Sequence, residues 1–484
     1  MNTILLIPTG EGVGLTSACL GMIYALDCKG INAGFLKPFS QLADAAVDRT
    51  ATLYRHLFQH QSVEPITYEK LTQLLGSGET DELLEETVAL HRKISAHHDV
   101  IIVEGLVPNG QDHFAGEINA ALAQALDAQV VLVSTADLAD PRKTAEKVDA
   151  HLRQFGGAAS TRTTGVLFMR TKGLPDGTAA IPVTLDPGLR LDKQIAEFSI
   201  QLQRYNRFIG TDELPIIGLV PFSNILSVPR SLDIATVVNG TWLNEGEAKQ
   251  RRILHTSLIA SDIEAELHKF VAGELIISAS QRTDALLAAS LASSNGIPLA
   301  GLVLTEQAAP AANILEFCQG AIKQGLPILH TTLDTLETAQ RLYHFGNEIP
   351  VDDIERAEQV TRFVSSHLDN NWLDQHTQNN LNPRLSPSAF RYELVQKSIA
   401  AKKRIVLPEG DEPRTVQAAA ICQSRGIAEC ILLAKPEAVA EVAKARGIQL
   451  PSDLQIIDPD HIRDQYIEPM VELRKGKLDA LQAK

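Results

Sequence analysis

A glycine-rich stretch near the N-terminus has the spacing of a phosphate-binding loop. An apolar run at 3–7 leads into TGEGVGLTS at 9–17. In such a loop, backbone N–H groups surround the phosphates, a lysine neutralises their charge, and a following hydroxyl binds a metal ion. Here Leu15 stands where the lysine belongs, which argues against ATP hydrolysis and for a degenerate loop kept for structure, assembly or ligand sensing. The residues of this degenerate phosphate loop are Thr9, Gly10, Gly12, Gly14, Thr16 and Ser17.

Two further positions fit descent from a nucleotide-binding fold. Lys37 and Pro38 follow an apolar run, and Glu104 ends the apolar run at 99–103. A carboxylate in that place could hold a magnesium-bound water, although a single acid at a strand end is more commonly just solvated. Both interpretations of Glu104 stay open.

The most distinctive short motif is RIVLPEGDEPRT at 404–415. An apolar strand is predicted to end at Leu407, an acidic turn follows, and Arg414 begins the next helix. In parallel α/β sheets, ligands bind at the carboxyl ends of strands, and arginine offers a fork that fits phosphate or carboxylate. We therefore take Arg414 and Asp411 as candidate binding residues. The alternative is a local salt bridge from Arg414 to Asp411 or Glu409.

No other constellation predicts a catalytic or metal centre. The histidines show no metal-ligand spacing, and no Ser-His-Asp or Cys-His set can be assigned. Five cysteines at irregular spacing, without a CxxC pair, are typical of reduced thiols in a cytosolic protein. From the residues alone we identify no catalytic group and no metal site, and Arg474 is no more than a basic residue near a helix end.

The elements that must position these residues alternate between short apolar runs and longer helical patterns. Apolar character on nearly every position of the runs indicates strands covered on both faces, hence parallel sheets with helical crossovers and multidomain α/β architecture. The predicted strands are 3–7, 99–105, 129–134, 164–169, 215–221, 274–279, 299–305, 327–330, 404–408 and 430–434.

Length and composition divide the chain further. Its 484 residues exceed a single hydrophobic core. We predict one domain over 1–222, a second over 223–350, a helix and linker over 351–388 that is rich in Asn, Gln and Pro at its end, and a third domain over 389–484. The third block offers few strands and ends on a polar helix, so we expect it to be incomplete at its C-terminal side.

The charge and the absence of targeting signals limit the partners and the location. A formal net charge of -15 disfavours nucleic acid and anionic membranes as partners. The N-terminus lacks a basic region before its short apolar run, and no run is long enough for a membrane span. We expect a cytoplasmic protein.

The order of these motifs resembles the long, three-domain form of bacterial phosphate acetyltransferase. The similarity rests on the loop at 7–17, VEGLVP at 103–108, EIPVDDIERAE at 348–358, LSPSAFRYEL at 385–394 and, most specifically, KRIVLPEGDEPRTVQAAAICQSRGIA at 403–428. It implies a P-loop-like domain similar to dethiobiotin synthetase, a DRTGG-like regulatory domain whose motif is degraded to QRTDA at 281–285, and the N-terminal part of a phosphate acetyl/butyryl transferase domain.

The resemblance also implies an activity and a site. Members of this family interconvert acetyl-CoA and phosphate with acetyl phosphate and coenzyme A, need no metal or further cofactor, and form homo-oligomers that are hexamers in long-form relatives. By motif, Arg414 and Arg474 carry over as residues that bind phosphate or coenzyme A. The family's catalytic serine, aspartate and further arginine have no counterpart here, so we expect this chain alone to be inactive.

Two alternatives remain beside this enzyme. One is a non-catalytic regulatory or assembly protein that binds nucleotides or central metabolites through its first two domains. The other is an ATP-dependent ligase or NTPase of the dethiobiotin class, which only the degenerate loop suggests.

Overall fold

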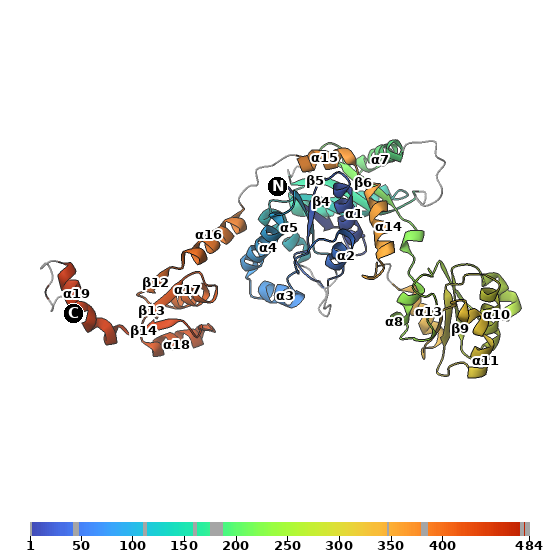
Figure 1. Ribbon diagram of the computed structural model, residues 1–484. Coiled ribbons are helices and arrows are strands. Elements are labelled where there is room, and N and C mark those ends of the chain that lie inside the picture. The colour runs from blue at the N-terminus through green and yellow to red at the C-terminus, as the bar shows by residue number, and fades with distance from the viewer. Residues whose placement is uncertain are drawn as a thin grey trace. The chain divides into compact units, whose positions relative to one another are not determined.

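The computed structural model describes residues 2–41, 48–109, 114–157, 162–174, 187–345, 348–378, 386–474 and 479, with only the backbone described for 187–192. These residues form two compact units. The larger unit contains a six-stranded and a five-stranded sheet, and the smaller contains a three-stranded sheet (Figure 1).

The first sheet is parallel throughout and has the strand order β2-β3-β1-β4-β5-β6. Every residue of β1, β3 and β6 is buried, which explains why their sequences are continuous apolar runs. The strands are β1 (Asn2–Pro8), β2 (Ala33–Leu36), β3 (Val100–Glu104), β4 (Gln129–Asp137), β5 (Thr163–Lys172) and β6 (Ile216–Pro221). β1 lies between β3 and β4, so the strand order changes direction at β1. In open α/β sheets, ligands bind beside such a point, at the carboxyl ends of the strands.

Seven α-helices among the described residues accompany this sheet. They are α1 (Leu15–Asp27), α2 (Arg49–Phe58), α3 (Tyr68–Gly76), α4 (Thr80–Ser95), α5 (Ala115–Ala125), α6 (Pro141–Leu152) and α7 (Pro187–Gln203). Local sequence sets some of their starts: Asp140 caps α6 by accepting a hydrogen bond from the N–H of Lys143, and Pro141 occupies the first turn, where its missing N–H does no harm.

The second sheet has the order β7-β11-β10-β9-β8, with β7 antiparallel to β11 and the other pairs parallel. Its strands are β7 (Thr241–Asn244), β8 (His255–Leu258), β9 (Glu274–Ala279), β10 (Gly301–Thr305) and β11 (Ile328–His330). Its helices are α8 (Ile234–Val237), α9 (Ile263–Glu266), α10 (Thr283–Ser294), α11 (Ala312–Phe317), α12 (Gln319–Lys323) and α13 (Thr335–Tyr343).

The third sheet is a parallel three-stranded sheet in the order β12-β13-β14. Strands and helices alternate along it: α16 (Pro387–Ala401), β12 (Arg404–Leu407), α17 (Pro413–Ser424), β13 (Glu429–Leu433), α18 (Pro436–Arg446), β14 (Gln455–Ile457) and α19 (Pro459–Leu473). All four residues of β12 are at least partly exposed, so this edge strand is less well covered than the strands of the first sheet.

Two helices that follow the second sheet in sequence pack against the body of the first. Figure 1 shows α14 (Ile354–Ser365) beside α1, and Val364 contacts Gly21 of α1. In α15 (Asn370–Gln378), Trp372 is 3% exposed and its indole N–H donates to the carbonyl oxygen of Thr164 at 2.9 Å. This part of the expected linker is therefore a packed helix, while residues 379–385 lie outside the described residues.

The α/β fold class, with parallel sheets and helical crossovers, is confirmed, and each of the ten predicted strands corresponds to a strand of the structure. The sequence did not predict β2, β7, β8 and β14. None of the helices in the described part of the chain is both long and apolar enough to cross a bilayer. All five cysteines are unpaired.

Candidate anion-binding sites

The glycine-rich loop joins β1 to α1 and has the backbone that its sequence predicts. Gly12 has a φ of 64° and Gly14, which caps α1, a φ of 86°, a region that side chains with a Cβ rarely adopt. Thr9 is turned inward, where its hydroxyl donates to Ser134 Oγ at 2.8 Å. Leu15 is 5% exposed and belongs to the hydrophobic core between α1 and the sheet. The residue that replaces the loop lysine therefore serves packing.

A buried ion cluster lies behind this loop. Lys37 Nζ, just after β2, is 2.9 Å from Asp48 Oδ2 and 2.9 Å from Glu104 Oε1. Burial alone would lower the pKa of Lys37, but the adjacent carboxylates of Glu104 and Asp48 raise it above its ordinary value. Lys37 is therefore a permanent cation held by two carboxylates.

Hydroxyl groups connect this cluster to the start of α1. Thr16 Oγ1 is 2.9 Å from Thr50 Oγ1, and Thr50 Oγ1 donates to Glu104 Oε1 at 3.3 Å. In a complete phosphate loop, the hydroxyl at the position of Thr16 binds the metal ion. Here the hydrogen bonds from Thr16 through Thr50 lead instead to the carboxylate of Glu104, which is already paired with Lys37. Glu104 is therefore not simply solvated. The sequence pointed to Lys37 and Glu104 and missed Asp48, which no motif marks.

Ser17 lies in the first turn of α1 and is partly exposed, and Gly10 lies in the loop, where a Cβ would come 3.9 Å from Lys147 Nζ. The loop residues are thus brought together as expected. Among the described residues, no group of three or more His, Cys, Asp or Glu side chains could hold a metal ion.

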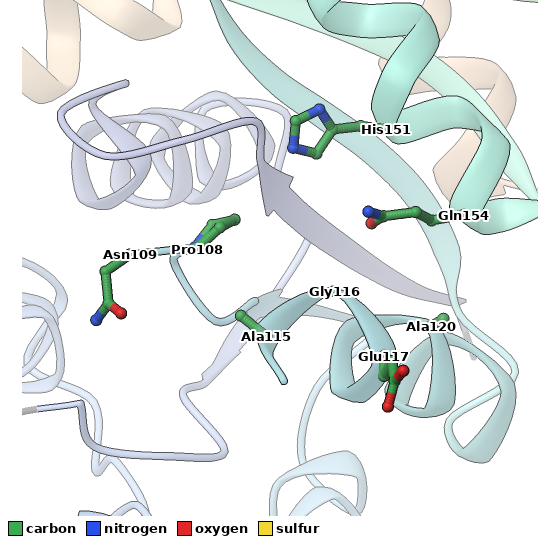
Figure 2. Close-up of a pocket in the computed structure, with 8 residues that line it drawn as sticks. All are labelled: Pro108, Asn109, Ala115, Gly116, Glu117, Ala120, His151 and Gln154. Atoms are coloured by element: carbon green, nitrogen blue, oxygen red, sulfur yellow. The ribbon is translucent and has the colours of Figure 1, made fainter. Parts of the chain in front are cut away.

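A cavity of about 550 Å³ lies on the same domain, between α5 and the end of α6. Figure 2 shows His151 and Gln154 facing the helix that carries Gly116 and Glu117, with Pro108 on the opposite wall. Its lining combines one carboxylate with an imidazole, and the His151 ring nitrogen Nδ1 already lies 3.0 Å from the carbonyl oxygen of Lys147. These groups do not form an acid–base pair of recognisable geometry.

The third sheet carries the candidate arginine of the PEGDEPRT motif. Arg414 lies in the first turn of α17, directly after β12, and its side chain is 91% exposed. Its Nε donates to Glu412 Oε1 at 2.9 Å, and this pairing raises the pKa of Arg414 and lowers that of Glu412. The local salt bridge considered from the sequence thus exists, but its partner is Glu412 and not Asp411 or Glu409. Glu412 also caps α17 through the N–H of Thr415.

The other two candidate residues are placed separately. Asp411 is exposed in the turn that precedes α17, and Arg474 is exposed at the C-terminal cap of α19. The structure gives no contact that joins either of them to Arg414, so the roles of all three remain predictions.

Three family models match successive parts of this chain. An AAA domain matches residues 2–230, a DRTGG domain matches residues 233–345, and the phosphate acetyl/butaryl transferase family matches residues 389–484.

Curated relatives match along nearly the whole chain. The phosphate acetyltransferase of Acinetobacter baylyi is 74% identical over 484 residues, which are 100% of this chain and 67% of that protein. The phosphate acetyltransferase of Pseudomonas aeruginosa is 42% identical over 479 residues, covering 99% of this chain and 66% of the relative. The phosphate acetyltransferase of Escherichia coli is 37% identical over 483 residues, covering 98% of this chain and 66% of that protein. The chain spans about two thirds of the length of these relatives.

Proposed function

Because this chain belongs to the phosphate acetyltransferase family, we propose that it serves reversible acetyl transfer between acetyl-CoA and phosphate. The observation that carries the proposal is the identity of 74% with a phosphate acetyltransferase over all 484 residues. The match of residues 389–484 to the transferase family model supports it. The same identity does not favour a purely regulatory protein or an ATP-dependent ligase.

The proposed reaction forms one bond and breaks one. A phosphate oxygen attacks the carbonyl carbon of the acetyl thioester, the carbon–sulfur bond breaks, and coenzyme A leaves as the thiol after protonation. The reactants carry several negative charges, so cationic side chains must hold them close together. No cofactor takes part in this scheme.

Arg414 is the described residue best suited to hold one of these anionic groups. It lies in the first turn of α17, whose N-terminus favours anions, and its guanidinium is exposed to solvent, where it pairs with Glu412. Asp411 in the same turn and Arg474 on α19 complete the proposed binding set. We assign no general base among the described residues, so ligand binding is the step on which this set can be tested.

The test compares coenzyme A binding by calorimetry with phosphate-dependent thiol release from acetyl-CoA. Arg414→Gln is expected to weaken coenzyme A binding about tenfold, because a charge-assisted hydrogen bond is lost. Arg446→Gln removes the same charge from the exposed end of α18 and should change binding less than twofold. Equal binding by the wild type and both variants would rule out Arg414 as a contact. Thiol release that does not depend on phosphate would argue against transfer to phosphate.

The domain limits and the assembly belong to the same proposal. We propose a P-loop-like domain over 1–222, a DRTGG-like regulatory domain over 223–350, a connecting segment over 351–388 and the transferase segment over 389–484, working in a cytoplasmic homo-oligomer. The three matched families, which begin at residues 2, 233 and 389, support this division.

A further inference from the structure

A second cavity, of about 800 Å³, opens at the carboxyl edge of the first sheet. Its lining comes from the carboxyl ends of four neighbouring strands: Gly12 lies after β1, Thr135 near the end of β4, Arg170 near the end of β5, and Phe222 directly after β6. The first turns of α6 form a further wall. A volume of this order suits a small molecule, and the position is the usual ligand edge of a parallel sheet.

Cationic side chains outnumber carboxylates in this cavity, although the whole chain is strongly acidic. Its charged lining residues are Lys143, Lys147, Arg170, Lys172, Asp137 and Asp140. Both carboxylates are engaged by the backbone: Asp137 Oδ1 accepts from the N–H of Ala139 at 2.9 Å, and Asp140 Oδ1 accepts from the N–H of Lys143 at 3.0 Å. The cavity therefore presents a local positive charge within a chain of net charge -15.

Two of these cations are bonded to neutral oxygens. Lys147 Nζ donates to Thr135 Oγ1 at 3.2 Å, and Arg170 Nη1 donates to the carbonyl oxygen of Gly12 at 3.3 Å. Burial lowers the pKa of both groups, and the neighbouring Lys143 contributes to the shift at Lys147. Their positive charges are thus partly desolvated, and among the described residues neither forms an ion pair with a carboxylate, although Asp137 and Asp140 line the same cavity. An incoming anion would supply the missing counter-charge.

Arg170 is also held by its backbone and by an aromatic ring. Its φ is 52°, a left-handed conformation that is uncommon for a residue with a Cβ and is concentrated at ligand sites. Its guanidinium carbon lies 5.2 Å from the centre of the Phe222 ring, within the range of a cation–π contact. The guanidinium is therefore positioned before any ligand arrives.

Lys147 reaches the loop from which the usual lysine is missing. Its Cε and Nζ atoms lie 3.9 Å from where a Cβ on Gly10 would be, so a helix elsewhere in the fold brings an ammonium to the glycine-rich loop. One carboxylate oxygen of Glu104, at the end of β3, is in contrast already paired with Lys37.

From these observations we infer that this cavity binds a phosphate-bearing small molecule without a divalent cation, with Lys147 and Arg170 as its principal contacts. The two cations replace the loop lysine from α6 and β5. All of its lining residues precede the transferase segment in the chain, and the inference does not rest on acetyl transfer.

Calorimetric titration of the intact chain with inorganic pyrophosphate, in low salt with EDTA, tests the inference. Lys147→Gln and Arg170→Gln should each weaken binding about tenfold or more, because each removes a charge-assisted hydrogen bond. Arg142→Gln is the matched control: it lies in the same first turn of α6 as Lys143, pairs with Glu146 and is outside the cavity lining, so binding should change less than twofold. A parallel titration with ADP shows whether the cavity recognises more than the diphosphate.

Several results would overturn the inference. They are the absence of pyrophosphate binding up to millimolar concentration, binding that disappears with EDTA and returns with magnesium, or the same affinity in the wild type and all three variants. Far-UV circular dichroism and the midpoint of thermal unfolding check that each variant is folded. Lys147 and Arg170 come from different elements, so either variant carries the test if the other fails to fold.

Discussion

Lys37 forms a buried ion cluster near the glycine-rich loop. Its ammonium joins Asp48 and Glu104, while the loop position itself is filled by an apolar residue in the core. The pairing is strongly buried, with both carboxylate side chains 5% exposed. Removing a cation fixed in this way would leave two buried carboxylates without a counter-ion.

Replacing Lys37 by Met is expected to lower the free energy of unfolding by roughly 3 to 5 kcal/mol, because two buried carboxylates lose their counter-ion. Chemical denaturation at neutral pH measures this loss. Lys29→Met is the control, since its pair with Asp374 is more exposed and worth about 1 kcal/mol at most.

A double variant separates charge from packing. Adding Glu104→Gln to Lys37→Met should recover part of the lost stability, because one uncompensated charge is removed. If the double variant is no more stable than Lys37→Met alone, the uncompensated buried charge is not the cause of the loss.

His91 provides a pH dependence whose sign is determined. Its Nε2 lies 3.0 Å from Thr3 Oγ1, and burial, assisted by Arg92, lowers its pKa to about 4. The folded protein therefore binds this proton less readily than the unfolded chain does. The contribution of His91 is complete above about pH 6.5 and is lost as the pH falls from there towards 4, with an upper limit of about 3 kcal/mol.

Comparison of the wild type with His91→Gln isolates this contribution. Between pH 7 and pH 4.5, the midpoint of thermal unfolding should fall further in the wild type than in the variant, which has no group to protonate at this position. Parallel curves over this range would contradict the assignment.

At the scale of elements, close packing of α1 against α14 depends on a missing side chain. A Cβ on Gly21 would lie 2.4 Å from Val364 Cγ1, well inside van der Waals contact. The pattern of apolar residues predicts that both helices are buried, but it does not show which helix covers α1, because that partner comes more than 300 residues later in the chain.

Gly21→Ala should therefore destabilise the protein by about 1 to 3 kcal/mol, even though alanine is the better helix former. Gly76→Ala, at the end of α3 with open space around it, should be neutral or slightly stabilising. Denaturation midpoints compare the two. A stabilised Gly21→Ala variant would show that α14 moves away from α1 at little cost.

The four strands that the sequence did not predict are short edge strands, and two of them also lack buried residues. β7 and β8 contain only exposed and half-buried residues, TWLN and HTSL, and lie at the two edges of their sheet. β2 and β14 are edge strands of four and three residues. Exposure removes the apolar run from β7 and β8, whereas β2 is fully buried and was missed because its four residues are too short a run to identify as a strand.

Composition also misled the prediction around residue 370. The stretch DNNWLDQHTQ is rich in Asn and Gln and was predicted as linker, yet it forms α15 because Trp372 and Leu373 are buried against the first domain. Two large apolar side chains outweighed the helix propensity of their polar neighbours.

At the scale of the whole molecule, an ion network connects segments that are distant in sequence. Arg252 Nη2 donates to Asp353 Oδ1 at 2.8 Å, and Arg230 Nη2 donates to Asp233 and to Asp352 at 2.7 and 2.8 Å. Asp353 also caps α14. Burial by itself would raise the pKa of Asp353, but Arg252 and Arg230 lower it below the usual value.

Asp353→Asn keeps the helix cap and removes the charge, so it isolates the network. The expected loss is roughly 2 to 4 kcal/mol, because a buried partner of two arginines is neutralised. Asp352→Asn, whose side chain is 60% exposed, should change stability by less than about 1 kcal/mol. Scanning calorimetry measures both, and equal effects would mean that burial does not decide the strength of these pairs.

Some residues of the candidate sites could be predicted from the sequence and others could not. The glycine-rich loop, Lys37, Glu104 and the position of Arg414 after a strand were all visible as local patterns. Asp48, Lys147 and Arg170 were not, because they are brought to the loop region by elements distant in sequence. The ion-pair partner of Arg414 could not be predicted either, because the geometry of the turn decides which of its acidic residues Arg414 contacts. That residue is Glu412.

The burial of Leu15 makes the conversion of this loop difficult to reverse. A lysine introduced at that position would have to leave a buried apolar layer, and Glu104 Oε1, which accepts a hydrogen bond from Thr50, is already paired with Lys37. Restoring hydrolysis would thus require changes both at Leu15 and in the ion cluster around Lys37.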